Sequence, residues 1–277
     1  MRKNRNQTFR LTVFLFSICL FSFCKKSTEQ GANNPPVTPP QDTTITTATP
    51  TYQLIWSDEF DSSVINTNNW NFETGGNGWG NHEQEYYQAA NADIENGNLV
   101  ITAKKESVGS NGYTSSRMTT QGKKEFFYGK VEARIRIPVG QGFWPAFWML
   151  GSDINTVPWP ACGETDIMEH INTDSVIYGT AHWDDNGHVQ DGGNTTSSPS
   201  EYHVYTVEWD ADYIKWSIDS VEYHQTGINA TTMGEFRAPF FILLNFAVGG
   251  DWPGQTIDDS LLPAKMYVDW VRVYQKK

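Results

Sequence analysis

Three acidic residues, Glu164, Asp166 and Glu169, lie close together in the segment WPACGETDIMEHI, residues 159–171. Two carboxyl groups can cleave a glycosidic bond when one attacks the sugar and the other protonates the departing oxygen. Enzymes that retain the configuration of the sugar hold these two groups about 5–5.5 Å apart. The β-branched and apolar residues between the acids favour a β-strand, so this strand must bring the carboxyls to one side.

The spacing of the acids decides where they point. Glu164 and Asp166 are two residues apart and share a face, whereas Glu169 would point to the opposite face of a regular strand. A β-bulge around Ile167-Met168 would return Glu169 to the common face. The two glutamates would then be separated by about four strand steps, roughly 13 Å of backbone, which their long side chains can largely close. We therefore predict a bulged strand with all three acids on one face.

Three carboxyl groups on one face cannot all be ionised at low cost. One proton is therefore retained, and the carboxyl that keeps it has the raised pKa of a general acid. Asp166, between the glutamates, would orient the attacking carboxylate and couple the titrations. The alternative is an acidic strand that faces solvent, but a solvated face does not need the tryptophan and proline residues that flank this segment.

Apolar and polar residues alternate through most of the chain after residue 51, as they do in half-buried β-strands. Clear cases are residues 99–103, 131–137 and 205–209. The alternation on both sides of Asp219-Ser220 predicts a hairpin with a two-residue turn. The pattern predicts an all-β domain in which two antiparallel sheets pack as a sandwich of the β-jelly-roll type. Tryptophans on such strands are assigned to the core: Trp56, Trp209, Trp216 and Trp270.

The composition limits the partners of this domain. The 277 residues include 20 Lys and Arg against 32 Asp and Glu, a formal net charge of -12. This charge repels nucleic acids and anionic membranes. Two of the three cysteines, Cys19 and Cys24, lie near the N-terminus, so Cys162 has no partner for a disulfide in the folded domain. Packing and bound ions must therefore hold the domain together.

The first fifty residues predict export. Basic residues up to Arg10 precede the apolar run LTVFLFSICLFSFC, which suits a secretory signal better than a spanning helix, so residues 1–24 are predicted to be a signal peptide. Cys24 ends this run and resembles the lipidated cysteine of a bacterial lipoprotein; the alternative is an ordinary signal peptide cleaved a few residues later. Residues 25–50 contain five Pro and are typical of an extended linker. We expect a secreted or surface-tethered protein that meets a membrane only through such a lipid anchor, with its working domain in residues 51–277.

The segment GETDIMEH resembles the ExDxxE active-site strand of glycoside hydrolase family sixteen, in the bulged form found in bacterial laminarinases. The resemblance covers residues 51–277 and includes further motifs: WSDEF (56–60), GWGNHEQEYY (78–87), YTSSRM (113–118), YGKVEARIRIP (128–138), GFWPAFWMLG (142–151), AHW (181–183), VEWD (207–210), NFAVGGDWPG (245–254) and VDWVRVYQ (268–275). It implies a β-jelly roll with an open groove on its concave face. It also implies endo-acting cleavage of a β-linked glucan with retention, with Glu164 as nucleophile, Glu169 as acid/base and Asp166 as their assistant.

A groove for a polysaccharide needs aromatic platforms for the flat C–H faces of sugars and polar side chains for their hydroxyl groups. The candidate platforms lie in or just before the motifs above: Trp144, Trp148 and Trp159. The resemblance implies that Asn81 and Arg117 contact sugar hydroxyls on the glycone side and that His182 lies near the scissile bond.

The resemblance also implies a structural Ca²⁺ on the convex side, bound by backbone oxygens and one Asp. The matching positions are Glu59, Gly97 and Asp269, and oxygen ligands suit such a hard cation. The alternative is that Asp269 is only a solvent-facing strand residue. Catalysis is expected to need no cofactor, and we expect a monomer whose partner is a β-glucan polysaccharide.

Three functions stay open at this point. The first is an endo-β-1,3-glucanase, or laminarinase, acting by double displacement on laminarin-like polymers, which the anionic surface suits because these glucans are neutral. The second is a hydrolase of the same fold for mixed-linkage β-1,3-1,4-glucan or an algal galactan. The third is a noncatalytic glucan-binding module. Intact Glu164 and Glu169 argue against the third, since a binder does not need an acid pair that shares a proton.

Overall fold

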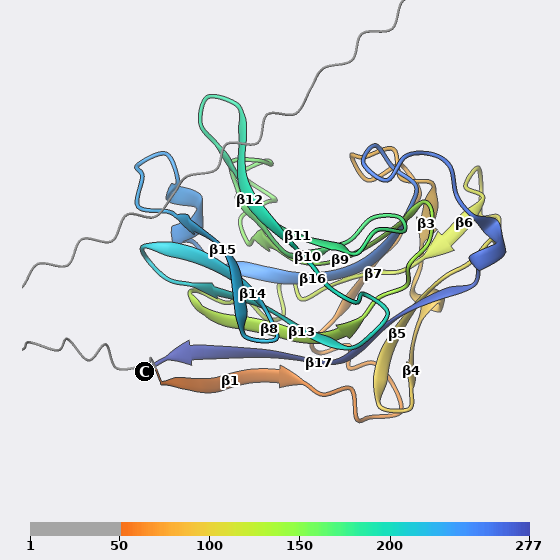
Figure 1. Cartoon of the computed structure of the whole chain (residues 1–277), viewed down its shortest axis with the longest axis horizontal. Coiled ribbons are helices and arrows are strands. Elements are labelled where there is room, and N and C mark those ends of the chain that lie inside the picture. Colours follow the sequence, from red (N-terminus) through yellow and green to blue (C-terminus); the bar gives the residue numbers. More distant parts are fainter. Residues whose placement is uncertain (1–50) are drawn as a thin grey trace, which may run out of the picture. The chain divides into compact units, whose positions relative to one another are not determined.

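The computed structural model describes residues 51–277, so the predicted signal peptide, Cys24 and the linker of residues 25–50 lie outside the described residues. The regular structure of the described part is almost entirely β-strand, in two large antiparallel sheets and one small parallel pair (Figure 1). Its helices are three short 3-10 turns: η1 (Ala89–Asn91), η2 (Gly234–Arg237) and η3 (Asp259–Leu261). In this part of the chain, no helix has the length and apolar character that a membrane span requires.

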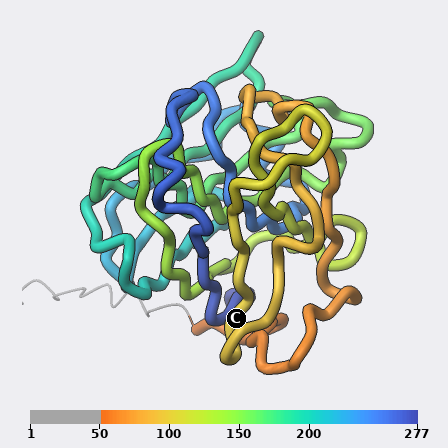
Figure 2. Tube along the Cα trace, turned by 90° about the vertical axis from the view of Figure 1, so that its right-hand side faces the viewer, coloured from red at the N-terminus to blue at the C-terminus, as the bar shows by residue number. Residues whose placement is uncertain are grey.

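The eight-stranded sheet forms one layer of the sandwich. Its strands are, in spatial order, β15 (Val221–Gly227), β14 (Tyr213–Ile218), β13 (His203–Trp209), β8 (Gly129–Arg136), β17 (Ala264–Lys276), β5 (Asn98–Ala103) and β4 (Ala92–Glu95), and β1 (Tyr52–Asp58) also pairs with β17. Figure 2 shows the C-terminal strand β17 running between β8 and β5, as this order requires.

The seven-stranded sheet forms the second layer and carries the acidic segment. Its order is β12 (His188–Thr196), β11 (Val176–Asp184), β10 (Glu164–Glu169), β9 (Phe143–Gly151), β16 (Phe240–Val248), β7 (Arg117–Thr119) and β2 (Asn71–Glu73). The sheet is curved, and the hairpin between β11 and β12 rises above its outer face (Figure 1). The small pair, β3 (Glu85–Tyr87) and β6 (Tyr113–Ser115), lies beside it.

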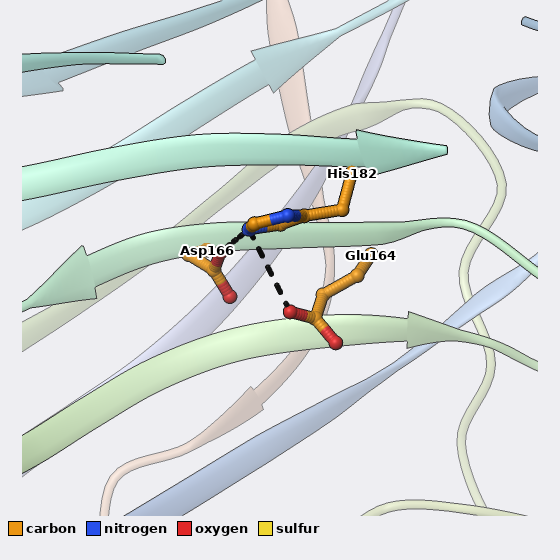
Figure 3. Close-up of side chains that lie close together, drawn as sticks. All are labelled: Glu164, Asp166 and His182. Atoms are coloured by element: carbon orange, nitrogen blue, oxygen red, sulfur yellow. Dashed lines mark hydrogen bonds and ion pairs between the residues drawn. The ribbon is translucent and has the colours of Figure 1, made fainter. Parts of the chain in front are cut away.

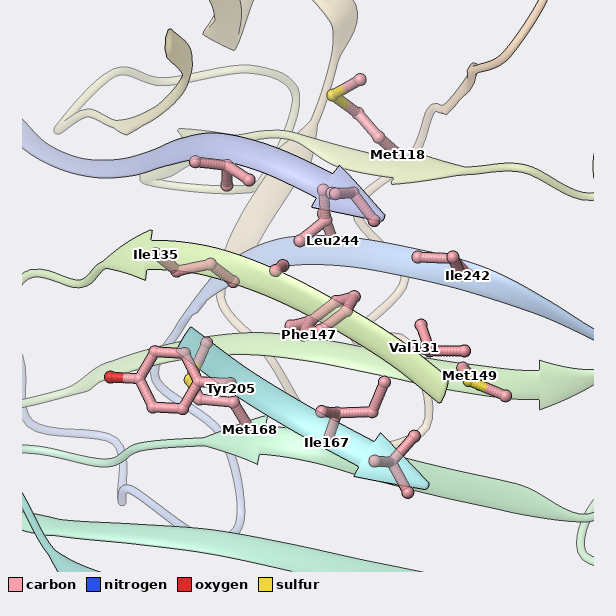
Figure 4. Packing of buried hydrophobic residues seen from close by; sticks show 14 of the residues in the cluster. Met118, Val131, Ile135, Phe147, Met149, Ile167, Met168, Tyr205, Ile242 and Leu244 are labelled. Atoms are coloured by element: carbon pink, nitrogen blue, oxygen red, sulfur yellow. The ribbon is translucent and has the colours of Figure 1, made fainter. Parts of the chain in front are cut away.

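Alternating apolar side chains of the two sheets form the core, as their period of two predicts. Val131 and Ile135 of β8 are fully buried, and they face Phe147 of β9 and Leu244 of β16 (Figure 4). The predicted sandwich of two antiparallel sheets is therefore confirmed. The predicted hairpin is also present, because Asp219 and Ser220 both have positive φ, 49° and 67°, and join Ile218 to Val221.

A smaller apolar cluster covers part of the outer face of the seven-stranded sheet. Leu150, Cys162, Phe241 and Leu243 are buried there, with Trp148 packed against them. The segment between β9 and β10 contributes Ile154, Val157 and Cys162 to this cluster. This segment also contains Trp159, so the cluster holds the backbone that carries Trp159 against the sheet.

Candidate active site

Strand β10 has the predicted bulge. Asp166 pairs with Trp148 of β9 and Thr180 of β11, but the next paired residues are Met168 on the β9 side and Glu169 on the β11 side. Ile167 and Met168 are both buried in the core between the sheets (Figure 4). Because two consecutive side chains turn inward, Glu164, Asp166 and Glu169 all lie on the outer face of the sheet.

The three acids lie in a cleft of about 350 Å³ on this face. Five of the six predicted sugar-contacting residues line it with them: Asn81, Arg117, Trp144, Trp148 and Trp159. The sixth, His182, adjoins the acids directly. The structure therefore brings together residues that are spread over about a hundred positions of the sequence.

His182 of β11 lies between two of the acids (Figure 3). Its Nε2 atom is 2.9 Å from Oδ2 of Asp166 and 3.8 Å from Oε1 of Glu164. Its Nδ1 atom is 2.8 Å from Nε2 of His188, a residue that the sequence did not single out. Burial and the neighbouring His182 lower the pKa of His188, so neutral His188 can accept the Nδ1 proton of His182. Donation from Nδ1 to His188 and from Nε2 to Asp166 at the same time requires a proton on both ring nitrogens of His182, which is the imidazolium form.

Burial raises the pKa of all three carboxyl groups above their ordinary values. For Glu169, burial and then the charge of Asp166 raise the pKa to about 8, and a hydrogen bond from Trp144 opposes the rise. For Glu164, burial and then the Asp166 charge likewise raise the pKa to about 8, while His182 and Arg117 favour the ionised form. The cleft therefore retains at least one carboxyl proton at neutral pH, as a general acid requires.

Aromatic residues extend the site on the Glu169 side. Trp144 donates its indole N–H to Oε1 of Glu169 at 2.9 Å. The edge of this ring meets Trp252, with centroids 5.6 Å apart, and Trp252 in turn contacts Tyr178 at 4.9 Å. Trp252 is 40% exposed. At the Glu164 end Trp159 is 44% exposed and lies 4.6 Å from the ring of His188.

Arg117 connects two tryptophans on the other side of the acids. Its guanidinium lies 5.0 Å from the centroid of Trp79 and 4.8 Å from that of Trp148, and it forms an ion pair with Glu73. Arginine held between two aromatic faces loses little conformational freedom when it binds a hydroxyl group.

A hydrogen-bonded chain beneath the cleft links two of the predicted sugar-contacting residues. Asn81 donates to Oε1 of Glu83 at 3.1 Å, and the Tyr87 hydroxyl donates to Oε2 of the same carboxylate at 2.9 Å. Asn245 donates to the Tyr87 oxygen at 3.1 Å and accepts from the indole of Trp148 at 2.7 Å.

Glu83, Tyr87 and Asn245 were not among the predicted site residues. A signal was present for Asn245, which is the one polar residue in the apolar strand FFILLNFAV, residues 240–248. A polar residue in such a strand needs a buried partner. Glu83 and Tyr87 carried no such signal.

The three predicted calcium positions meet at one edge of β17. Along this edge β5 pairs as far as Val268 and β1 pairs from Val271 onward, so Gly97 and Glu59 flank the irregular residue Asp269. Both side chains are engaged, however. Arg272 binds both oxygens of the Glu59 carboxylate at 3.0 and 2.8 Å, and Arg134 lies 2.6 Å from Asp269. The Asp269 carboxylate would have to leave Arg134 to bind a cation.

Residues 79–272, which contain the whole cleft, match Glycosyl hydrolases family 16. The chain belongs to this family. It is 39% identical over 246 residues to the beta-glucanase of Rhodothermus marinus, a match that covers 82% of this chain and 86% of that protein. It is 44% identical over 233 residues to the clotting factor G alpha subunit of Tachypleus tridentatus, which covers 82% of this chain and 34% of that one. The chain thus spans about a third of the clotting factor subunit and most of the beta-glucanase.

A solved laminarinase structure has the same fold. The laminarinase catalytic domain of Thermotoga maritima superposes with a TM-score of 0.76 at 44% identity, covering 82% of this chain and 99% of that domain. The predicted family membership and the β-jelly-roll class are both confirmed.

Proposed function

We propose that this family 16 domain is an endo-acting, retaining glycoside hydrolase that cleaves β-1,3-glucosidic bonds in laminarin-like glucans. The bulge of β10 is the observation that carries the proposal, because it turns Glu164 and Glu169 into one cleft with Asp166 between them and His182 beside Glu164 and Asp166. A retaining glycosidase uses a pair of carboxyl groups, one as nucleophile and one as acid/base, and this cleft contains such a pair among aromatic side chains. The names of its relatives, a laminarinase and a beta-glucanase, support the same activity.

In the first step the Glu164 carboxylate attacks the anomeric carbon, and a bond forms between its oxygen and that carbon. The bond to the glycosidic oxygen breaks, and this oxygen takes the proton that the raised pKa of Glu169 retains, while His182 and Arg117 favour the ionised form of Glu164. In the second step ionised Glu169 takes a proton from water, and the water oxygen displaces Glu164. The β-configuration is retained after two inversions.

Asp166 and His182 contribute to these two reaction steps by controlling the charge of Glu164. His182, 3.8 Å from Glu164, stabilises the carboxylate when it holds a proton on Nε2. The hydrogen bond of that nitrogen to Asp166 keeps the ring in place. No catalytic cofactor enters this scheme, because both proton transfers use side chains of the cleft.

Sugar binding is assigned to both sides of the acids. We assign the glycone side to Asn81, Arg117 and Trp148 and the aglycone side to Trp159 and His182. Partly exposed indoles stack on the C–H faces of glucose, and the acidic chain, with a net charge of -12, suits a neutral polymer.

A reducing-end assay on laminarin, lichenan and agarose tests the substrate. New ends from laminarin are expected, and the first-formed product should be the β-anomer by proton NMR. Glu164→Gly should abolish hydrolysis, and azide should restore turnover as a glycosyl azide, because the small anion occupies the place of the lost carboxylate. Equal stimulation of the wild type by azide would contradict the assignment of Glu164.

A galactan is the second candidate substrate, because one relative is a keratan-sulfate endo-1,4-beta-galactosidase from Sphingobacterium multivorum, 34% identical over 285 residues. Release of ends from agarose or keratan sulfate in preference to laminarin would favour it. A mixed-linkage glucanase would instead prefer lichenan. Binding to laminarin with no new ends from any polymer would leave only the glucan-binding module.

We further propose that the protein is exported as a monomer and that a Ca²⁺ ion binds beside Asp269. Labelling of Cys24 with a palmitate analogue, lost in Cys24→Ser, tests the lipid anchor.

Thermal melting with and without EDTA tests the Ca²⁺ ion. A Tm that EDTA lowers and that Ca²⁺ but not Mg²⁺ restores would support the site, and an unchanged Tm would contradict it.

A further inference from the structure

The bulge of β10 has a hydrogen-bond partner on the opposite sheet. A bulge interrupts the ladder between strands, so the backbone beside it needs support from elsewhere. The carbonyl oxygen of Asp166, the last residue before the bulge that pairs with both neighbouring strands, accepts a buried hydrogen bond of 2.7 Å from the indole N–H of Trp216. Trp216 belongs to β14 of the eight-stranded sheet and is fully buried.

The strand beside the bulge leaves room for this indole. Gly179 of β11 lies between Thr180, which pairs with Asp166, and Tyr178, which pairs with Glu169. Gly179 therefore stands opposite the two bulged residues. A Cβ atom at this position would collide with the ring of Trp216 and with the Tyr223 hydroxyl. Only glycine at position 179 lets the indole come this close to the bulge.

A second β-bulge, in strand β15, lies directly beside Trp216. Strand β15 shifts register against β14 between Trp216 and Ser217, so Trp216 pairs with His224 and Ser217 with Glu222. Tyr223 is the extra residue, and its ring turns inward beside Gly179. The bulges of the two sheets therefore meet at Trp216.

We propose that Trp216 is a positioning residue of the active site, whose indole N–H holds the β10 bulge so that Glu164 and Glu169 face the same cleft. It touches no substrate. It acts through the Asp166 backbone, halfway between the two glutamates. Its catalytic consequence rests on the proposed function, whereas its hold on the bulge does not.

Trp209 provides a matched control for the test. It is also a buried tryptophan of the eight-stranded sheet, and it donates its indole N–H to the carbonyl of Phe236 at 2.9 Å, away from the cleft. Trp216→Phe and Trp209→Phe each remove one such bond, so both should lower the Tm. Only Trp216→Phe should lower kcat on laminarin, by about 10- to 100-fold, because the catalytic carboxyls lose their spacing. KM should change less than about twofold, since the tryptophan platforms stay in place.

Equal losses of kcat in the two variants, or full activity of Trp216→Phe, would overturn the proposal. Hydrogen exchange of residues 164–170 gives a readout that needs no substrate. Exchange should be faster in Trp216→Phe than in Trp209→Phe, and unchanged protection would also overturn it. If the wild type fails to cleave laminarin but the exchange result is as expected, the proposed function fails while the structural inference holds.

Two further variants separate the hydrogen bond from the packing. Replacing Trp216 by 3-benzothienylalanine exchanges the N–H for sulfur at nearly constant shape, so it serves if Trp216→Phe does not fold, and the same loss of kcat is expected. Gly179→Ala should displace the indole and also lower kcat. Gly112→Ala is its control, because a Cβ there meets no atom within 4 Å. Wild-type kcat in both test variants would contradict the proposal.

Discussion

Trp144 donates its indole N–H to Oε1 of Glu169, and the two atoms are 2.9 Å apart. This bond favours the charged form of Glu169, against the burial that raises its pKa to about 8. A group that must give a proton in one step and take one in the next needs a pKa near the working pH. Burial, which raises the pKa of Glu169, and the indole hydrogen bond, which lowers it, together set such a value.

We expect kcat/KM of the wild type on laminarin to fall at high pH with an apparent pKa of about 8, because Glu169 then loses the proton that it must donate. The pH dependence of kcat/KM between pH 5 and 10 checks this. A plateau that extends to pH 10 would remove Glu169 from the role of acid.

Trp144→Phe should move this alkaline limb to higher pH. Without the indole N–H the charged form of Glu169 loses a hydrogen bond, so its pKa rises further. We expect a shift of about half a pH unit to one unit, with a lower kcat because the base form is less stable. Trp252→Phe is the control, since Trp252 touches the Trp144 ring without contacting Glu169. A downward shift in Trp144→Phe would contradict this account.

Glu169→Gln should stabilise the folded domain at pH 8 but not at pH 4. The pKa of Glu169 is raised on folding, so between its unfolded value and about 8 the folded state holds a proton that the unfolded state has lost. Stability therefore falls as the pH rises through this range, and an amide does not titrate. We expect a gain of about 1–3 kcal/mol in the free energy of unfolding at pH 8. Urea unfolding at both pH values measures it, and an equal gain at pH 4 would point to another cause.

Tyr87→Phe should weaken substrate binding and lower stability. The Tyr87 hydroxyl joins Glu83 to Asn245, so its loss leaves both buried groups short of a partner, at a cost of about 1–3 kcal/mol in the free energy of unfolding. The KM for laminarin should rise by about three- to tenfold, because the side chains of Asn81 and Trp148 are held in place by hydrogen bonds to Glu83 and Asn245, which Tyr87 connects. Tyr86→Phe is the control, because alternate residues of a strand face opposite sides. Unchanged KM in Tyr87→Phe would separate the hydrogen-bonded chain from sugar binding.

Several features of the site could be predicted because they depend on local geometry. The five-residue separation of Glu164 and Glu169 already requires a bulge if both are to face one cleft, and the structure has that bulge at Ile167-Met168. The alternation that placed Trp209 and Trp216 in the core was also right, since both side chains are buried. It was wrong for Trp270, which is only half-buried under Arg272, because the irregularity at Asp269 shifts the inward-facing positions of β17 by one residue. The alternation could not identify the acceptor of the Trp216 indole N–H, because that acceptor, the carbonyl of Asp166, lies on the other sheet.

The sequence by itself determined the class of fold, the bulged strand and the acidic triad, because side-chain direction in a strand follows from spacing along one segment. Only the tertiary structure decided which groups surround the triad. His188, the Glu83–Tyr87–Asn245 chain and the bond from Trp216 to Asp166 join residues up to 158 positions apart. Such contacts depend on how strands are ordered and how the two sheets stack, and no local period of apolar residues records either.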